Sequence, residues 1–154
     1  MRPMRPRYIL RRWKGSIEET VRRVNVGYFD FEARGLTRLV VLATGGRGYT
    51  DDARIRRVMN SLQPGLVIHG DCAEGVDGLV DLWAYETKVH VARVPALWDA
   101  FGSSAGPLRN EKMLKLSPEF VVAFPGDSGT ANMVGLAAKA RIPTLECLPL
   151  QTSV

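Results

Sequence analysis

Short apolar runs alternate with amphipathic stretches along most of this chain. Five runs of four or five mainly apolar residues are bounded by Gly, Pro or polar residues, which is typical of parallel strands buried on both faces. The stretches between them repeat apolar residues at helical spacing, as Ile55, Val58, Met59 and Leu62 do. The pattern predicts strands at 39–43, 66–69, 90–94, 120–124 and 144–147, and helices near 52–62, 75–87, 105–116 and 129–140.

Strands that alternate with helices predict an α/β fold. We expect a single doubly wound, Rossmann-like parallel sheet of about five strands with flanking helices. Residues 36–154 would form this domain, and residues 1–35 a basic N-terminal extension. In such sheets ligands bind beyond the carboxyl ends of the strands, so the residues that follow each strand matter most for function.

The N-terminal extension carries the whole excess of positive charge. Its 35 residues hold nine Arg and Lys against four Asp and Glu, which equals the chain's formal net charge of +5. Residues 1–15 have an irregular pattern, whereas Ser16 and Glu19 form a capping box that predicts one short helix, which Gly27 can close. A basic arm could contact nucleic acid, an acidic partner or a neighbouring subunit, but we favour a solvated tail.

Composition fits one globular domain of 154 residues, of which 45% are apolar and 24% charged. There is no apolar run near the roughly 20 residues that cross a bilayer and no signal-peptide core, so we expect no membrane partner. Cys72 and Cys147 fall in different elements and form no metal-ligand pair, which favours the reducing cytoplasm. No group of residues has metal-ligand spacing, and we expect neither a metal nor a bound cofactor.

Glycine and polar residues gather where the predicted strands end. Gly45, Gly46 and Arg47 follow the first strand directly, and the second and fourth strands are also followed by glycine-containing turns. Glycine lets the backbone approach a ligand closely, and a turn that leads into a helix offers N–H groups and the helix dipole to an anion. Thr50, Asp51 and Asp52 are candidate caps of the next helix. Because several such turns share one sheet edge, we expect one anion-binding crevice there.

Five blocks of sequence resemble a known group. They are Gly-Gly-Arg-x-Tyr-x-Asp at 45–51, His-Gly-x-Cys-x-x-Gly-x-Asp at 69–77, Pro-Ala-x-Trp at 95–98, Ala-Gly-Pro-x-Arg-Asn at 105–110 and Ala-Phe-Pro-Gly-x-x-Gly-Thr at 123–130. In this order they resemble the YspA/YpsA-related branch of the SLOG superfamily, Rossmann-like relatives of the LOG cytokinin phosphoribohydrolases and of the DNA-processing protein DprA. The resemblance covers roughly residues 38–146 and implies a nucleotide or a nucleotide-derived ligand.

Two departures from the superfamily's pattern bear on activity. Residues 125–130 resemble its Pro-Gly-Gly-x-Gly-Thr phosphate loop, but Asp127 replaces the second glycine, and a carboxylate beside a phosphate is repulsive unless it points outward or meets Arg47 or Arg109. The catalytic Glu of the LOG hydrolases corresponds here to Met133, whose thioether is no general base. LOG-type hydrolysis therefore does not carry over, and whether the chain is an enzyme stays open.

The candidate site residues follow from these turns and blocks. Arg109 is the first candidate for phosphate, with a surface salt bridge as its alternative. Asn110 could bind ribose hydroxyls or cap its helix, and Asp77 could bind ribose hydroxyls or complement its helix dipole. Trp98 could stack on a base or pack in the core. His69, Asp71 and Asp77 are weak catalytic candidates, and a structural His69 is favoured. The expected ligand-binding residues are Gly45, Gly46, Arg47, Tyr49, His69, Gly70, Asp77, Trp98, Arg109, Asn110, Gly126, Ser128, Gly129 and Thr130.

Three functions remain, in this order of preference. The first is a module that binds a nucleotide-derived small molecule as a sensor or a sequestering protein. The second is a hydrolase of an N-glycosidic or phosphate bond that uses His69, Asp71 or Asp77 instead of the missing Glu. The third is DprA-like binding of nucleic acid through the basic arm. The LOG resemblance also implies a homo-oligomer, a dimer or higher.

Overall fold

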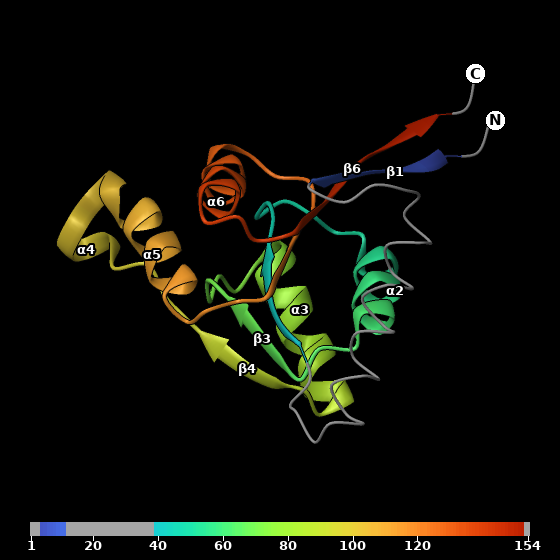
Figure 1. The fold of residues 1–154 in the computed structure, drawn as a ribbon, viewed down its shortest axis with the longest axis horizontal. Helices are drawn as coiled ribbons and strands as arrows, with labels where there is room; N and C mark the ends of the chain where they lie inside the picture. Colours follow the sequence, from blue (N-terminus) through green and yellow to red (C-terminus); the bar gives the residue numbers. More distant parts are fainter. Residues whose placement is uncertain (1–3, 12–38, 153–154) are drawn as a thin grey trace.

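A computed structural model of the chain describes residues 4–11 and 39–152. Helices and strands alternate through the second of these ranges, as Figure 1 shows by colour from cyan to red. The strands are β1 (Met4–Arg11), β2 (Val40–Thr44), β3 (Leu66–His69), β4 (His90–Arg93), β5 (Phe120–Ala123) and β6 (Thr144–Thr152). The helices are α2 (Asp52–Leu62), α3 (Gly75–Thr87), α4 (Trp98–Phe101), the 3-10 helix η1 (Gly102–Ser104), α5 (Ala105–Leu114) and α6 (Ser128–Lys139).

The strands form one sheet in the order β1-β6-β5-β2-β3-β4. The strands from β6 to β4 pair in parallel, which confirms the predicted Rossmann-like α/β fold with five parallel strands. After β2 the chain first adds β3 and β4 on one side and later returns to the other side with β5 and β6. The sheet therefore reverses its direction of growth between β2 and β5, and ligands bind at such a point in doubly wound sheets.

The start of the chain corrects one expectation. Residues 1–15 were expected to be irregular, but Met4–Arg11 form strand β1, which pairs antiparallel with β6 at the edge of the sheet (Figure 1). Strand β1 pairs through its backbone groups. Charged residues interrupt its apolar positions, so the side-chain pattern did not predict a strand. The short helix predicted between Ser16 and Gly27 lies outside the described residues.

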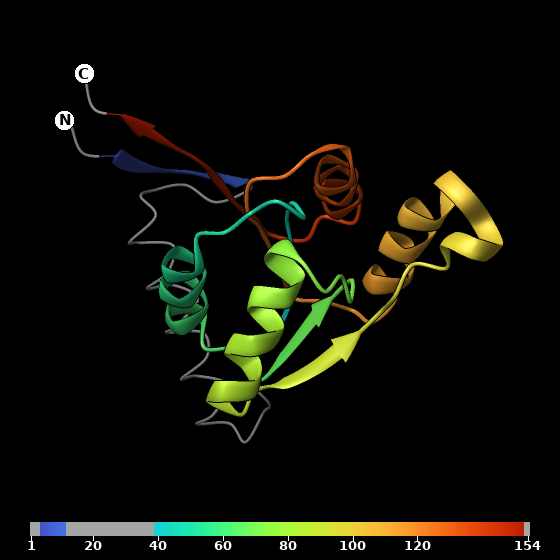
Figure 2. The same cartoon turned by 180° about the vertical axis from the view of Figure 1, so that it is seen from behind.

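Helices cover both faces of the sheet and divide its core into two clusters. Side chains of α2 and α3 pack on one face against Val41 and Ala43, whereas α5 and α6 pack on the other face against Leu42. This alternation along β2 follows from the two-residue period of a strand. Seen from behind, α2 and α3 lie together in front of the sheet, with α6 and α5 on the far side (Figure 2). The result is a three-layer arrangement whose loops meet at the sheet edge.

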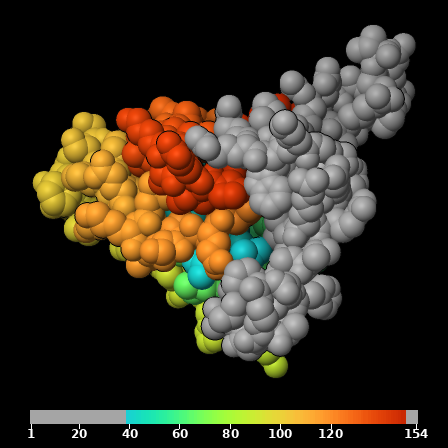
Figure 3. All heavy atoms as spheres, in the orientation of Figure 1, coloured from blue at the N-terminus to red at the C-terminus, as the bar shows by residue number. Residues whose placement is uncertain are grey.

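Of the three candidate caps for the helix at 52–62, the structure selects one. Asp51 is the N-cap of α2, because its carboxylate accepts a hydrogen bond from the Arg54 backbone N–H at 3.1 Å. Helix α4 was not predicted: the strand-end block at 95–98 leads into a four-residue helix and a 3-10 turn. Figure 3 shows this segment (yellow) at one edge of the molecule, beside α5 and α6 (orange and red).

Within residues 4–11 and 39–152 there is no helix that is both long and apolar enough to cross a membrane.

Candidate functional site

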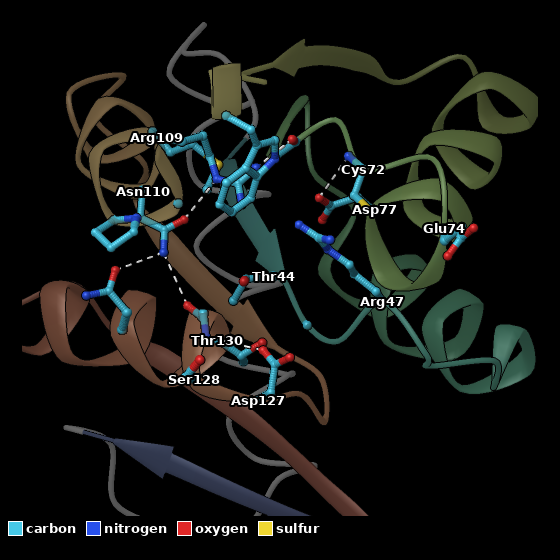
Figure 4. A pocket seen from close by; sticks show the side chains of 18 of the residues that line it. Thr44, Arg47, Cys72, Glu74, Asp77, Arg109, Asn110, Asp127, Ser128 and Thr130 are labelled. Atoms are coloured by element: carbon cyan, nitrogen blue, oxygen red, sulfur yellow. Dashed lines mark hydrogen bonds between the residues drawn. The ribbon is translucent and has the colours of Figure 1, made fainter. Parts of the chain in front are cut away.

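A cavity of about 390 Å³ lies at the carboxyl ends of the parallel strands. Its walls come from the loops after β2, β3 and β5, from α4 and η1, from the start of α3, and from α5 and the first two turns of α6 (Figure 4). The loops that the sequence predicted to converge therefore do converge. The lining residues are Thr44, Gly45, Arg47, Gly70, Cys72, Glu74, Asp77, Trp98, Ser103, Gly106, Pro107, Arg109, Asn110, Met113, Asp127, Ser128, Gly129, Thr130 and Asn132.

Backbone contacts hold together the loops that surround the cavity. The Gly46 N–H donates to the Pro125 carbonyl at 2.9 Å, and the Gly46 carbonyl accepts from the Val76 N–H at 3.2 Å. A side chain at Gly45 would collide with Val76, and one at Gly75, which has φ +69°, would collide with the backbone at Gly46. These glycines are required because the loops approach more closely than any Cβ permits.

Arg109 is held in place at the start of α5. One N–H of its guanidinium donates to the Gly70 carbonyl at 2.6 Å and its Nε–H donates to the Asn110 side chain at 3.1 Å. Partial burial, together with the positive charge of Arg47, lowers the pKa of Arg109, but a guanidinium stays charged in proteins. These two bonds use two of its five N–H donors, so the described contacts leave donors that a ligand oxyanion can accept from.

Asn110 ties α5 to α6 rather than capping its own helix. The side chain is 3% exposed, and its amide NH₂ donates to the Gly129 carbonyl at 3.2 Å and to the Asn132 side chain at 2.9 Å. A buried amide with these partners is a fixed element of the wall. Asn110 therefore fixes the separation between Arg109 and the first turn of α6.

Arg47 and Trp98 face each other at the mouth of the cavity. The Arg47 Cζ lies 5.4 Å from the centre of the Trp98 ring, within cation–π range. Trp98 is 47% exposed, so it does not pack in the core, which was the alternative left open by the sequence. Its ring is thus available for stacking at the rim, with a positive charge beside it.

Asp77 points into the cavity from the first turn of α3 (Figure 4). The Cys72 N–H donates to its carboxylate at 3.2 Å. Burial raises the pKa of Asp77, although the charges of His69 and Arg109 act in the opposite direction. A carboxylate with a raised pKa in a cavity is a typical acceptor for ligand hydroxyls and a candidate acid or base.

The first turn of α6 forms the wall opposite α3. Ser128, Gly129 and Thr130 line the cavity, and the amides at a helix start have no partners within the helix. Asp127 is the N-cap, and its carboxylate accepts from the Gly129 N–H at 3.2 Å. Gly126 lies just behind this turn, and a side chain there would collide with Thr130 and with the Gly46 backbone.

Five of the expected site residues do not line this cavity: Gly46 and Gly126, which lie behind its loops, and His69, Asp71 and Tyr49. His69 is 1% exposed; its Nδ1 accepts from the Asp71 N–H at 2.9 Å and its Nε2 lies 2.7 Å from the Asp81 carboxylate. Both ring nitrogens are thus used, and His69 and Asp71 line a separate hollow with Arg93. Tyr49 packs against Phe124 with ring centres 5.8 Å apart, and burial raises its pKa.

Sequence reasoning also missed residues that line the cavity. Thr44 is the last residue of β2, Ser103 belongs to the unpredicted turn after α4, and Asn132 lies one helical turn beyond Ser128. Helical spacing could have identified Asn132, because positions i and i+4 share a face. Met133, the position of the LOG glutamate, is buried with Leu42 and does not line the cavity.

No group of three or more His, Cys, Asp or Glu side chains that could hold a metal occurs in the part of the chain that the structure describes.

Comparison with known proteins identifies the family. The sequence profile of the YspA, cpYpsA-related SLOG family matches residues 39–101. The chain is also 35% identical over 117 residues to the Gene 61 protein of Mycobacterium phage D29, an alignment that covers 68% of this chain and 93% of that protein. The chain belongs to the YspA, cpYpsA-related SLOG family. The resemblance noted in the sequence blocks is thereby confirmed.

The profile match of this SLOG family ends before α5. It contains the loops after β2 and β3 and Trp98, but Arg109 and the α6 turn lie beyond it. Among solved structures, the E. coli tRNA N6-threonylcarbamoyladenosine dehydratase TcdA is similar at 12% identity with a TM-score of 0.46, over 84% of this chain and 61% of that one. The chain thus spans less than two thirds of the TcdA chain.

Proposed function

We propose that this SLOG protein binds a nucleotide or nucleotide-derived ligand in the cavity, as a sensor or a sequestering protein. One observation carries the proposal: Arg47, Arg109 and the first turn of α6 line the same cavity. Two guanidinium groups in one cavity favour an oxyanion such as phosphate, and the Ser128 and Thr130 hydroxyls of the α6 turn are further hydrogen-bond donors. Asp77 supplies an acceptor for hydroxyl groups, and the exposed ring of Trp98 supplies a surface for a base.

The proposal is tested by titrating the protein with a panel of nucleoside phosphates, ADP-ribose and NAD in a calorimeter, supported by thermal unfolding. We expect at least one ligand to bind and to raise the melting temperature, since a ligand that binds only the native state stabilises it. The Arg109→Gln variant should weaken that binding about tenfold or more, because it removes a charge-assisted hydrogen bond.

Lys112→Gln is the matched control for this test. Lys112 lies on the same helix and loses the same charge, but its side chain is exposed and does not line the cavity. It should bind ligand as the wild type does. A folded wild-type protein that binds no member of the panel contradicts the proposal, and so does equal binding by the wild type and the Arg109→Gln variant.

Hydrolysis of the bound ligand is a second proposal, favoured by the raised pKa of Asp77 inside the cavity. Asp77 would act as the acid or base, because His69 already uses both ring nitrogens within the fold. Incubation with nucleoside monophosphates and NAD, followed by product analysis, tests this. Release of free base or phosphate that the Asp77→Asn variant abolishes would support hydrolysis, and unchanged substrates would contradict it.

A further inference from the structure

The carboxylate of Asp127 occupies the start of α6, where an incoming anion would otherwise bind. Its Oδ1 accepts from the Gly129 N–H, and the Asp127 carbonyl accepts from the Ala131 N–H at 3.0 Å. The side chain thus turns toward the helix rather than toward Arg47 or Arg109, and it lines the cavity with Ser128 (Figure 4). The positive end of the helix dipole is therefore already neutralised by a residue of the chain itself.

The cavity lining carries two positive and three negative side chains. Arg47 and Arg109 are opposed by Asp77 and Asp127, and Glu74, which is exposed as Asp127 is, lies at the edge of the group, beyond Asp77 (Figure 4). Arg47 also contacts the Trp98 ring. The two arginines are sufficient for one phosphate group, but a second or third phosphate would have only the α6 turn to bind, where it meets a carboxylate of like charge.

We propose that Asp127 restricts this cavity to ligands that carry a single phosphate group. The arginines bind the phosphate, and the carboxylates of Asp77 and Asp127 accept hydrogen bonds from hydroxyl groups such as those of a sugar. Asp127 is thus a specificity-determining residue that discriminates against di- and triphosphates. This inference rests on the proposed function, since it concerns the ligand of the same cavity.

The test compares the mono-, di- and triphosphates of the four common ribonucleosides by calorimetry, with EDTA present to remove divalent cations that would mask phosphate charge. For the wild type we expect a monophosphate to bind most tightly and its triphosphate about tenfold more weakly, a difference of the size that one close like charge produces. The Asp127→Asn variant should keep its helix cap, because Asn caps as well as Asp does. In this variant the affinity for the triphosphate should rise about tenfold, and the affinity for the monophosphate much less.

Glu111→Gln is the matched control, because Glu111 is exposed on α5 and does not line the cavity. It removes the same charge and should leave the order of affinities unchanged. A wild type that binds triphosphate as tightly as monophosphate overturns the inference and leaves the proposed function standing. An unchanged ratio in Asp127→Asn, with unchanged melting temperature, also overturns it. A folded wild type that binds none of the twelve compounds overturns this inference and contradicts phosphate recognition as a whole.

Discussion

Asp77 and Arg109 illustrate how this cavity places opposite charges close together at partial burial. Burial raises the pKa of Asp77 and lowers that of Arg109, so the interior opposes the charged form of both side chains. Each charge in turn favours the charged form of the other. Arg109 keeps N–H donors beyond its two described hydrogen bonds, and these are the groups that the proposed ligand would use. Such residues commonly lower stability in exchange for binding.

The first prediction is that Asp77→Asn stabilises the protein at neutral pH. Because the native pKa of Asp77 is raised, the protonated form contributes stability that is complete below about pH 4, the ordinary range of an Asp pKa, and is lost as the pH rises through the native pKa. The neutral Asn avoids this loss. Thermal unfolding at pH 7 should show a higher melting temperature for the variant, and the difference should shrink towards pH 4.

A lower melting temperature for Asp77→Asn at pH 7 would contradict this prediction. It would mean that the attraction of Arg109 and the hydrogen bond from the Cys72 N–H outweigh the desolvation of the carboxylate. The same variant should bind the ligand more weakly in either case, since Asn replaces an ionised acceptor.

The second prediction concerns the two cysteines of the chain. Cys72 lines the cavity and is partly exposed, whereas burial in β6 leaves Cys147 1% exposed and raises its pKa to about 12. Since the thiolate is the reactive form, Ellman's reagent at pH 8 should modify one thiol in the native protein and the other only after unfolding. Cys72→Ser should remove the fast reaction, and bound ligand should slow it. A fast reaction that persists in Cys72→Ser would contradict the assignment.

At the scale of elements, the close approach of two loops depends on Gly75, the residue with which α3 begins. The third prediction is that Gly75→Ala destabilises the protein by about 1–3 kcal/mol, because its φ of +69° and its contact with the Gly46 backbone both exclude a side chain. Displacement of that loop should also move Arg47 and weaken ligand binding. Urea denaturation measures the first effect, and calorimetric titration the second.

Gly48→Ala is the control for this prediction. Gly48 belongs to the same turn region, but a Cβ there would meet no atom within 4 Å. We expect its stability to stay within about 0.5 kcal/mol of the wild type, as for an ordinary surface substitution. If both variants lose the same free energy of unfolding, the close approach of the loops is not the reason why residue 75 must be glycine.

The regular elements were predictable because their apolar periodicity is set by burial on both faces of the sheet. The helix at 52–62 and the strand at 66–69 have the predicted bounds. Helix α4 was not predictable, since four exposed residues carry no periodic signal. Strand β1 was missed because edge pairing of its backbone leaves little trace in the side chains.

The sequence predicted the position of the candidate site better than the side chains that line it. Strand ends predicted the cavity, because parallel strands present their loops at one edge. The same reasoning could not tell that His69 turns away to Asp81, because one residue of shift along a strand end reverses the face. Nor could it place Tyr49, which lies in the loop after β2 and packs against Phe124. Contacts between α5 and α6, such as those of Asn110, depend on tertiary packing alone.

At the scale of the whole molecule, the cavity lies where the two layers of helices meet across the sheet. The loops after β2 and β3 lead into α2 and α3 on one face, and the loop after β5 leads into α6 on the other. A ligand there contacts both layers and should stabilise the domain as a unit. Phosphate recognition at the reversal of the sheet between β2 and β5 is therefore the central property of the proposed function.

The most direct test is an NMR titration of ¹⁵N-labelled protein with the nucleotide that binds most tightly in the panel. We expect saturable shifts of the amides in 45–47, 70–77 and 127–130, together with that of the indole N–H of Trp98, and we expect these shifts to be lost in Arg109→Gln. Shifts confined to the hollow around His69 and Arg93, or to the surface around Tyr49 and Pro149, would contradict the proposed function.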